Sequence, residues 1–268
     1  MSTASLAVHQ LKYEQKSYWR NPASAFFTFA FPVMFLVIFA SLNTGNTVDF
    51  LGLDFNQYYV PGIICFGVIS ATYTNLAMTL SIRRDTGILK RLRGTPLPTG
   101  SLIGGLLLNA LVISVILTAI VMIVGISFYD VVVPGHWPAL LIALLVGAGT
   151  FSALGIAITI VIPNADAAPA IVNGVLFPIL FLSGVFFPIQ NDTAIAKIAD
   201  FFPIRHFVDA VFTAFDPRLP HGVSHGFAWR DIGVMLIWLA VGAVASIRHF
   251  RWEPASPTVR ARGRRRAT

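Results

Sequence analysis

The sequence alternates between long uncharged apolar stretches and short polar segments. Six uncharged stretches stand out, at residues 21–48, 55–82, 94–129, 131–165, 167–191 and 232–247. A helix needs about 20 apolar residues to cross the hydrocarbon of a bilayer. Five stretches are long enough, and the last becomes so when its flanking residues lie at the membrane interface. The pattern therefore predicts six spans, near residues 25–42, 60–82, 102–128, 138–162, 169–187 and 231–250.

The composition agrees with this pattern. Hydrophobic residues make up 56% of the 268 residues and charged residues 12%, whereas soluble domains are about 25% charged. A Lys, Arg or Asp at the centre of a span costs roughly 2.5–3.5 kcal/mol, so six stretches that all exclude charge are a strong membrane signal. We expect an all-α integral membrane protein with a single transmembrane domain over residues 1–268.

The first apolar stretch, 25–42, has a second interpretation, because it follows a basic segment as the core of a cleaved signal peptide would. It is longer than the roughly 7–15 residues of such a core and contains Pro32, which favours a span. Cys65 is the only cysteine, so an intrachain disulfide is excluded. Its place in an apolar stretch indicates a small buried side chain.

Lys and Arg collect on one side of the predicted membrane. Six spans put both chain ends on the same side, and that side carries all but four of the 19 Lys and Arg residues. The exceptions lie in the fifth connection and are Lys197, Arg205, Arg218 and Arg230. The positive-inside rule therefore predicts cytoplasmic termini. This topology and contact with anionic lipid headgroups explain the basic tail at 251–268, and we expect no nucleic-acid partner.

Two segments outside the spans have helical patterns of their own. Residues 1–22 place apolar side chains such as Ala7 and Tyr18 on one face, which predicts an amphipathic connecting helix in the inner interface; an ordinary cytosolic tail is the alternative. The outer connection at 188–230 is too long for a simple turn. Its pattern predicts two short re-entrant helices.

The second connection, 83–98, combines basic residues with a short apolar stripe. Leu89 and Leu92 would share one face of a short helix, and Pro96 bars its continuation. Such a helix on the cytoplasmic face is a structure that a soluble partner could push. Orientation alone explains the basic charge, so a plain basic loop is the alternative.

The sequence carries no motif for catalysis that we recognise. It contains no Gly-x-x-x-x-Gly-Lys-Ser/Thr segment and no Gly-Lys pair, which excludes a phosphate-binding loop of that kind. His206 with Asp209, and His221 with His225, have spacings that a metal site could use. Solvated residues of the outer loop are the favoured interpretation, so we expect no metal site, no catalytic residue and no bound cofactor.

Three groups of motifs carry a family resemblance. They are Tyr18-Trp19-Arg20-Asn21-Pro22 with Phe31-Pro32, then Tyr59-Val60-Pro61-Gly62 with the segment at 84–98, and finally Leu182-Ser183-Gly184-Val185-Phe186-Phe187-Pro188 with Phe202-Pro203-Ile204. In order and spacing they cover nearly the whole chain. The sequence thereby resembles the membrane permeases of type-2 ABC exporters, most closely the bacterial drug-resistance branch related to daunorubicin exporters. Asp85 departs from the family, which more often has Glu there.

The resemblance implies a permease that works with a second permease copy, or a homologous permease, and with a separate ABC ATPase subunit that binds ATP and Mg. Segment 83–98 would be the coupling helix that touches the ATPase, and the implied coupling residues are Arg84, Asp85, Gly87, Leu89, Lys90, Arg91 and Arg93. The substrate path would lie between the two permeases along the second and fifth spans. Its candidate lining residues are Phe66, Tyr73, Asn173 and Phe177.

Asn173 also stands out from the residues alone, because an amide at membrane depth needs a partner, a cavity or a substrate. A hydrogen bond between helices is the alternative. We expect an exporter of lipophilic or amphiphilic compounds, drug-like or lipid-like, in a bacterial inner membrane and in contact with its lipids. The competing hypotheses are an ion-coupled secondary transporter and a lipid-modifying membrane enzyme that would use His206 or Asp209.

Overall fold

The structure is a computed structural model that describes residues 3–49, 51–95, 98–190, 193–216, 218–219 and 226–249. The predicted basic tail at 251–268 and the pair His221 and His225 lie outside the described residues. Within the described part the chain is almost entirely helical, with a single two-residue β-hairpin in which β1 (Thr47–Val48) pairs antiparallel with β2 (Leu53–Asp54).

The helices occur along the chain in the order of the six predicted spans, with short helices between some of them. The connecting and spanning helices are α1 (Thr3–Trp19), α2 (Pro22–Leu42), α3 (Phe55–Ile69), a π-helix η1 (Ser70–Thr74), α4 (Asn75–Asp85), α5 (Ile88–Arg93), α6 (Thr99–Phe128), α7 (Trp137–Ile158), α8 (Ala168–Leu182), α9 (Ala194–Ala199), α10 (Pro203–Phe215) and α11 (Trp229–His249). The prediction of an all-α integral membrane protein is confirmed.

Five of these helices are long and apolar enough to cross a membrane, and α3, η1 and α4 together form one of them. The predicted fifth span differs, because α8 has 15 residues and a length of about 22 Å, against about 30 Å of hydrocarbon. The chain turns at Gly184, where φ is +79°. Val185 and Phe186 then pack into the core, so the last part of the predicted span is a buried turn.

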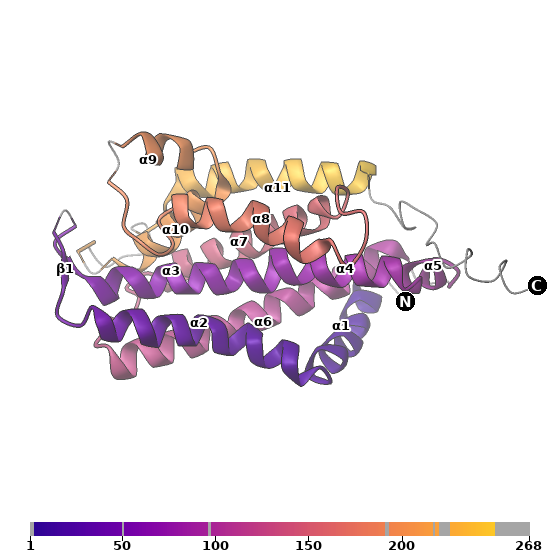
Figure 1. The fold of residues 1–268 in the computed structure, drawn as a ribbon, viewed down its shortest axis with the longest axis horizontal. Coiled ribbons are helices and arrows are strands. Elements are labelled where there is room, and N and C mark those ends of the chain that lie inside the picture. The colour runs from indigo at the N-terminus through magenta and orange to yellow at the C-terminus, as the bar shows by residue number, and fades with distance from the viewer. Residues whose placement is uncertain are drawn as a thin grey trace, which may run out of the picture.

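Figure 1 shows the spanning helices side by side along the long axis of the molecule. The helices α1 and α5 lie at one end, with the C-terminal end of α11, and β1 and α9 lie at the other end. This arrangement is the one that an even number of crossings requires. The helix α5, within the segment predicted as a coupling helix, is thus at the same end as the connecting helix α1.

The helix α3 forms the centre of the bundle. It is buried from Asn56 to Ile69 and packs against α2, α6, α7 and α10. The outer helices expose large apolar side chains instead, such as Phe26 on α2 and Ile237 on α11, which are 65% and 64% exposed. Hydrocarbon solvates such side chains, so their exposure is expected of a helix that faces lipid.

The π-helix η1 interrupts the second span at its middle. An extra residue in the turn leaves backbone carbonyls misaligned, and the Thr72 hydroxyl donates to the Val68 carbonyl oxygen at 2.6 Å. The opposing helix α7 approaches closely here, because Gly155 faces the backbone of Tyr73. The sequence pattern did not indicate this π-helix.

The close approach at Gly155 yields a stability prediction. In Gly155→Ala the new Cβ would lie 2.6 Å from the Tyr73 carbonyl oxygen, and overpacking of this kind costs roughly 1–3 kcal/mol. We expect a lower melting temperature of the purified protein in detergent. Gly149→Ala, on the same helix, is the matched control, because its Cβ would meet only the Leu239 side chain at 3.7 Å. Equal melting temperatures would contradict the close packing.

Candidate functional site

The segment after the second span forms a sharp corner followed by a short helix. Gly87 has φ of +73°, a conformation that side chains disfavour, and its carbonyl oxygen accepts from the backbone N–H of Arg91 as α5 begins. Leu89 is 1% exposed and packs in an apolar cluster with Leu80 and Leu102. The corner and this anchor fix the direction of α5.

Arg84 joins the C-terminal end of the second span to the connection between α7 and α8. Its side chain is 3% exposed and donates to the carbonyl oxygens of Thr159, at 2.9 Å, and Ile162, at 2.5 Å. Carbonyls just beyond a helix end lack intrahelical partners, and a cation there satisfies them. Asp85 accepts a hydrogen bond from the backbone N–H of Ala165 in the same connection. The two side chains hold α4 and the α7–α8 connection together.

A second attachment joins α4 to the connecting helix α1. Arg83 donates to both carboxylate oxygens of Glu14, at 2.8 and 2.5 Å, and Glu14 is 5% exposed. A two-point guanidinium–carboxylate pair is strong and directional. Sequence analysis missed Glu14, although the signal was present, since it is the only acidic residue before Asp49 in a basic segment.

The helix α1 rests on α6 and does not stand apart from the bundle. Ala7 packs against Gly104, and Gln10 packs against Gly105. A Cβ added at Gly104 would lie 3.0 Å from Ala7 Cβ, and one added at Gly105 would lie 2.4 Å from Gln10 Cγ, so neither glycine leaves room for a side chain. The apolar face of α1 with Ala7 and Tyr18 thus packs against other helices, while Val8 and Trp19 are about half exposed. The helix α1 is therefore packed on α6 and, through Glu14 and Arg83, bonded to α4.

The structure divides the seven predicted coupling residues into two groups. Arg84 and Leu89 are buried within the chain, while Asp85 and Gly87 form the corner. These four position the short helix. The other three are exposed cationic side chains at the end of the molecule, and they are Lys90, Arg91 and Arg93.

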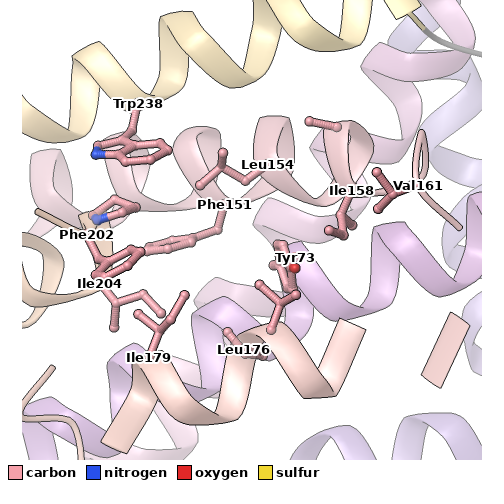
Figure 2. Close-up of a pocket in the computed structure, with 13 residues that line it drawn as sticks. Tyr73, Phe151, Leu154, Ile158, Val161, Leu176, Ile179, Phe202, Ile204 and Trp238 are labelled. Atoms are coloured by element: carbon pink, nitrogen blue, oxygen red, sulfur yellow. The ribbon is translucent and has the colours of Figure 1, made fainter. Parts of the chain in front are cut away.

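The four predicted path residues do not meet within one chain. Phe66 is 4% exposed and packs against Phe35 and Phe186, with ring centroids 6.1 and 5.5 Å away. Tyr73 lines a pocket between α7, α8, α10 and α11 that Phe66 does not line, shown in Figure 2. The two candidates on α8 are a half-buried and an exposed residue one helical turn apart, and they are Asn173 and Phe177.

The histidine considered for a metal site is buried and hydrogen-bonded, which corrects the expectation that it is a solvated loop residue. His206 lies on α10 with Nδ1 2.6 Å from an Asp231 carboxylate oxygen and Nε2 2.8 Å from the Asp200 carbonyl oxygen. Both partners accept, so the doubly protonated ring satisfies both, and the bond to Asp231 raises the pKa of His206.

The second member of the proposed metal pair faces elsewhere. Asp209 pairs with Arg205 at 2.9 Å instead of approaching His206. Among the described residues no group of three or more His, Cys, Asp or Glu side chains could hold a metal ion. The contact between His206 and Asp231 joins α10 to the N-terminal end of α11.

Comparison with known proteins adds an independent line of evidence. Residues 8–215 match the family model described as ABC-2 type transporter. The chain is 27% identical over 159 residues, 58% of its length and 60% of the relative's, to "Inner membrane transport permease YadH" of Escherichia coli (strain K12). It is 35% identical over 116 residues, 41% of its length and 42% of the relative's, to "Nodulation protein J" of Rhizobium leguminosarum bv. viciae.

A further relative matches over more of the chain. The protein named "Probable multidrug ABC transporter permease YbhR" of Escherichia coli (strain K12) is 22% identical over 200 residues, which is 74% of this chain and 53% of that protein. The chain thus spans no more than 60% of these three curated relatives. The family model, by contrast, extends from α1 to the last residue of α10. The chain belongs to the ABC-2 type transporter family.

Proposed function

We propose that this chain is the membrane-spanning permease of an ATP-driven ABC exporter in a bacterial inner membrane. The observation that carries the proposal is the short helix α5. It begins at a left-handed glycine, is anchored by the buried Leu89, and presents Lys90, Arg91 and Arg93 at the end of the molecule. A rigid, cationic projection of this kind suits docking into an acidic groove on a soluble subunit.

The attachments of α5 support a role in transmitting force. Through Arg84 the corner before α5 is joined to the connection between α7 and α8, and through Arg83 it is joined to α1. A push on α5 would therefore move three segments together and not a single loop. In this proposal Arg84 and Leu89 position the helix, and the exposed cations touch the partner.

ATP and Mg²⁺ would bind to the separate ATPase subunit, because the chain itself contains no phosphate-binding loop of the Gly-Lys type. Two permease copies, or this chain with a homologous permease, would enclose the path. The distribution of Lys and Arg along the sequence supports a cytoplasmic position for α1, α5 and both termini.

The proposed cargo is a lipophilic or amphiphilic compound, drug-like or lipid-like, taken from the cytoplasm or the inner leaflet. Aromatic side chains such as Phe66 and Phe177 suit apolar cargo, and the name of one relative, a probable multidrug permease, agrees with this class. Asn173 would supply a polar contact on α8. Membrane lipids would surround the exposed apolar faces of α2 and α11.

An ion-coupled secondary transporter is the alternative function. Such transporters relay protons or ions through carboxylates inside the membrane. In the described spans the acidic residues lie at the helix ends, as Asp85 and Asp231 do. Transport that collapses with a proton uncoupler at constant ATP would favour this alternative.

The division of labour gives a first prediction. The purified chain alone should hydrolyse no ATP, whereas the chain purified with its ATPase subunit should hydrolyse ATP at a rate that responds to cargo. Phosphate release in proteoliposomes measures both. ATP hydrolysis by the chain alone that persists through further purification would refute the proposed function.

A charge reversal tests the docking role of α5. Arg91→Glu should weaken binding to the ATPase subunit at least tenfold, because it places like charges at the proposed contact, while membrane insertion is unchanged. Co-purification and ATP-driven transport are the measurements. Lys197→Glu, an exposed reversal on α9 at the opposite end, is the control. Equal binding by both variants would contradict the assignment.

The pair between Glu14 and Arg83 provides a test of transmission. Glu14→Gln keeps the shape of the side chain but removes the charge, so α1 loosens from α4, and we expect at least threefold less cargo moved per ATP hydrolysed. Lys12→Gln, on an exposed position of the same helix, is the control. A ratio of transport to hydrolysis that stays the same in both variants would show that this pair does not transmit force.

A further inference from the structure

A cavity lies among the helices of the single chain. It has a volume of about 370 Å³ and lies between α7, α8, α10 and α11, with Tyr73 of η1 at one wall. Figure 2 shows its side chains pointing toward a common space, among them Phe151, Ile179 and Trp238. Its volume is within the range of small-molecule pockets, roughly 300–1,000 Å³.

The cavity has a buried floor and an exposed rim. Phe151, Leu176 and Ile204 are 2%, 5% and 3% exposed, while Val161 and Val175 are 62% and 44% exposed. It exists because α8 packs mainly on α4 and α9 and leaves space toward α7 and α11. Both α7 and α11 are long and apolar enough to cross a membrane, and in that placement the rim would open toward the hydrocarbon of the bilayer.

One polar atom points into this apolar space. Tyr73 is 6% exposed, and its hydroxyl has no hydrogen-bond partner in the part of the chain that the structure describes. Figure 2 shows the hydroxyl oxygen within the cavity. The indole N–H of Trp238 is already used, since it donates to the Phe201 carbonyl oxygen at 3.1 Å. A buried hydroxyl without a partner is costly and calls for one.

The backbone around Tyr73 places this hydroxyl. Tyr73 belongs to the π-helix η1, a distortion that often occurs at functional sites. The backbone of Tyr73 packs against Gly155 of α7, and its side chain lines the cavity. The cavity therefore offers apolar walls and a single hydrogen-bond donor at fixed position.

We propose that this cavity binds a compact, uncharged, lipophilic molecule that carries one carbonyl acceptor, with the Tyr73 hydroxyl donating to that carbonyl oxygen. The molecule reaches the cavity from the bilayer past Val175. An alkyl chain of a lipid would fill the walls but would leave the hydroxyl unpaired at membrane depth. A cationic or zwitterionic group would find no counter-charge among the lining residues.

Benzophenone is a suitable probe, because it is uncharged and lipophilic, has one carbonyl, and forms crosslinks under ultraviolet light. The full chain in liposomes is irradiated with benzophenone, without ATP or partner, and crosslinked residues are mapped by mass spectrometry. We expect labelling of α7 and α8 residues around the cavity above that of the lipid-facing Phe26 and Phe27 on α2, which are 65% and 64% exposed.

Two variants test the two parts of the proposal. Tyr73→Phe keeps the volume and removes the donor, so labelling at the cavity should fall about fivefold, which corresponds to roughly 1 kcal/mol for one hydrogen bond. Val175→Trp obstructs the rim and should abolish it. Val244→Trp is the matched control, because Val244 is 48% exposed on α11 and does not line the cavity; its labelling should equal that of the unaltered chain.

Labelling of the cavity no stronger than that of α2, or unchanged in Tyr73→Phe, would overturn the proposal. A second copy of the chain seated over the rim would give the first of these results. The inference is independent of the proposed function, since the assay contains neither ATP nor an ATPase subunit. If the unaltered chain with its ATPase subunit showed no ATP-driven transport but the cavity were still labelled, the exporter function would be refuted and the binding site would not.

Discussion

The absence of water inside the bilayer is the constraint on which the rest of this structure depends. Each backbone N–H and C=O must find its partner inside the protein, because hydrocarbon offers none. Helices satisfy this demand along most of the chain. Where regular α-helix gives way, side chains add hydrogen bonds. The Thr72 hydroxyl of the π-helix donates to the Val68 carbonyl oxygen of α3, and Arg84 donates to the Thr159 and Ile162 carbonyl oxygens beyond α7.

The same constraint explains why charged side chains and their contacts lie near the ends of the bundle. Ionic groups are inexpensive only near the aqueous boundary, so the pair between Glu14 and Arg83 and the bonds of Arg84 and Asp85 lie where the second span leaves the membrane. These bonds convert a corner, a short helix and two neighbouring segments into one mechanical unit. The proposed docking of an ATPase subunit uses this unit, while the apolar middle of the bundle remains available to lipophilic molecules.

The contrast between two neighbouring positions in the middle of the second span clarifies the predicted path. Phe66 packs into an aromatic cluster with Phe35 and Phe186, whereas Tyr73, seven residues later in the chain, faces the cavity beside α7 and α8. Seven residues would repeat on nearly one face of an ideal α-helix. The π-helix lies between the regular segments α3 and α4 and shifts the face on which the following residues lie. The periodicity of the sequence does not indicate this shift.

By itself the sequence determined five long apolar spans with their approximate limits, the uneven distribution of basic residues along the chain and the family. Each of these depends on local composition, since hydrocarbon excludes charge from any 20-residue helix wherever it packs. Only the tertiary structure decided that α8 stops at Leu182, that Glu14 meets Arg83, that His206 is held by Asp231, and that the Tyr73 hydroxyl faces a cavity. These features join residues far apart in the chain, and a contact of that kind leaves no periodic trace in either segment.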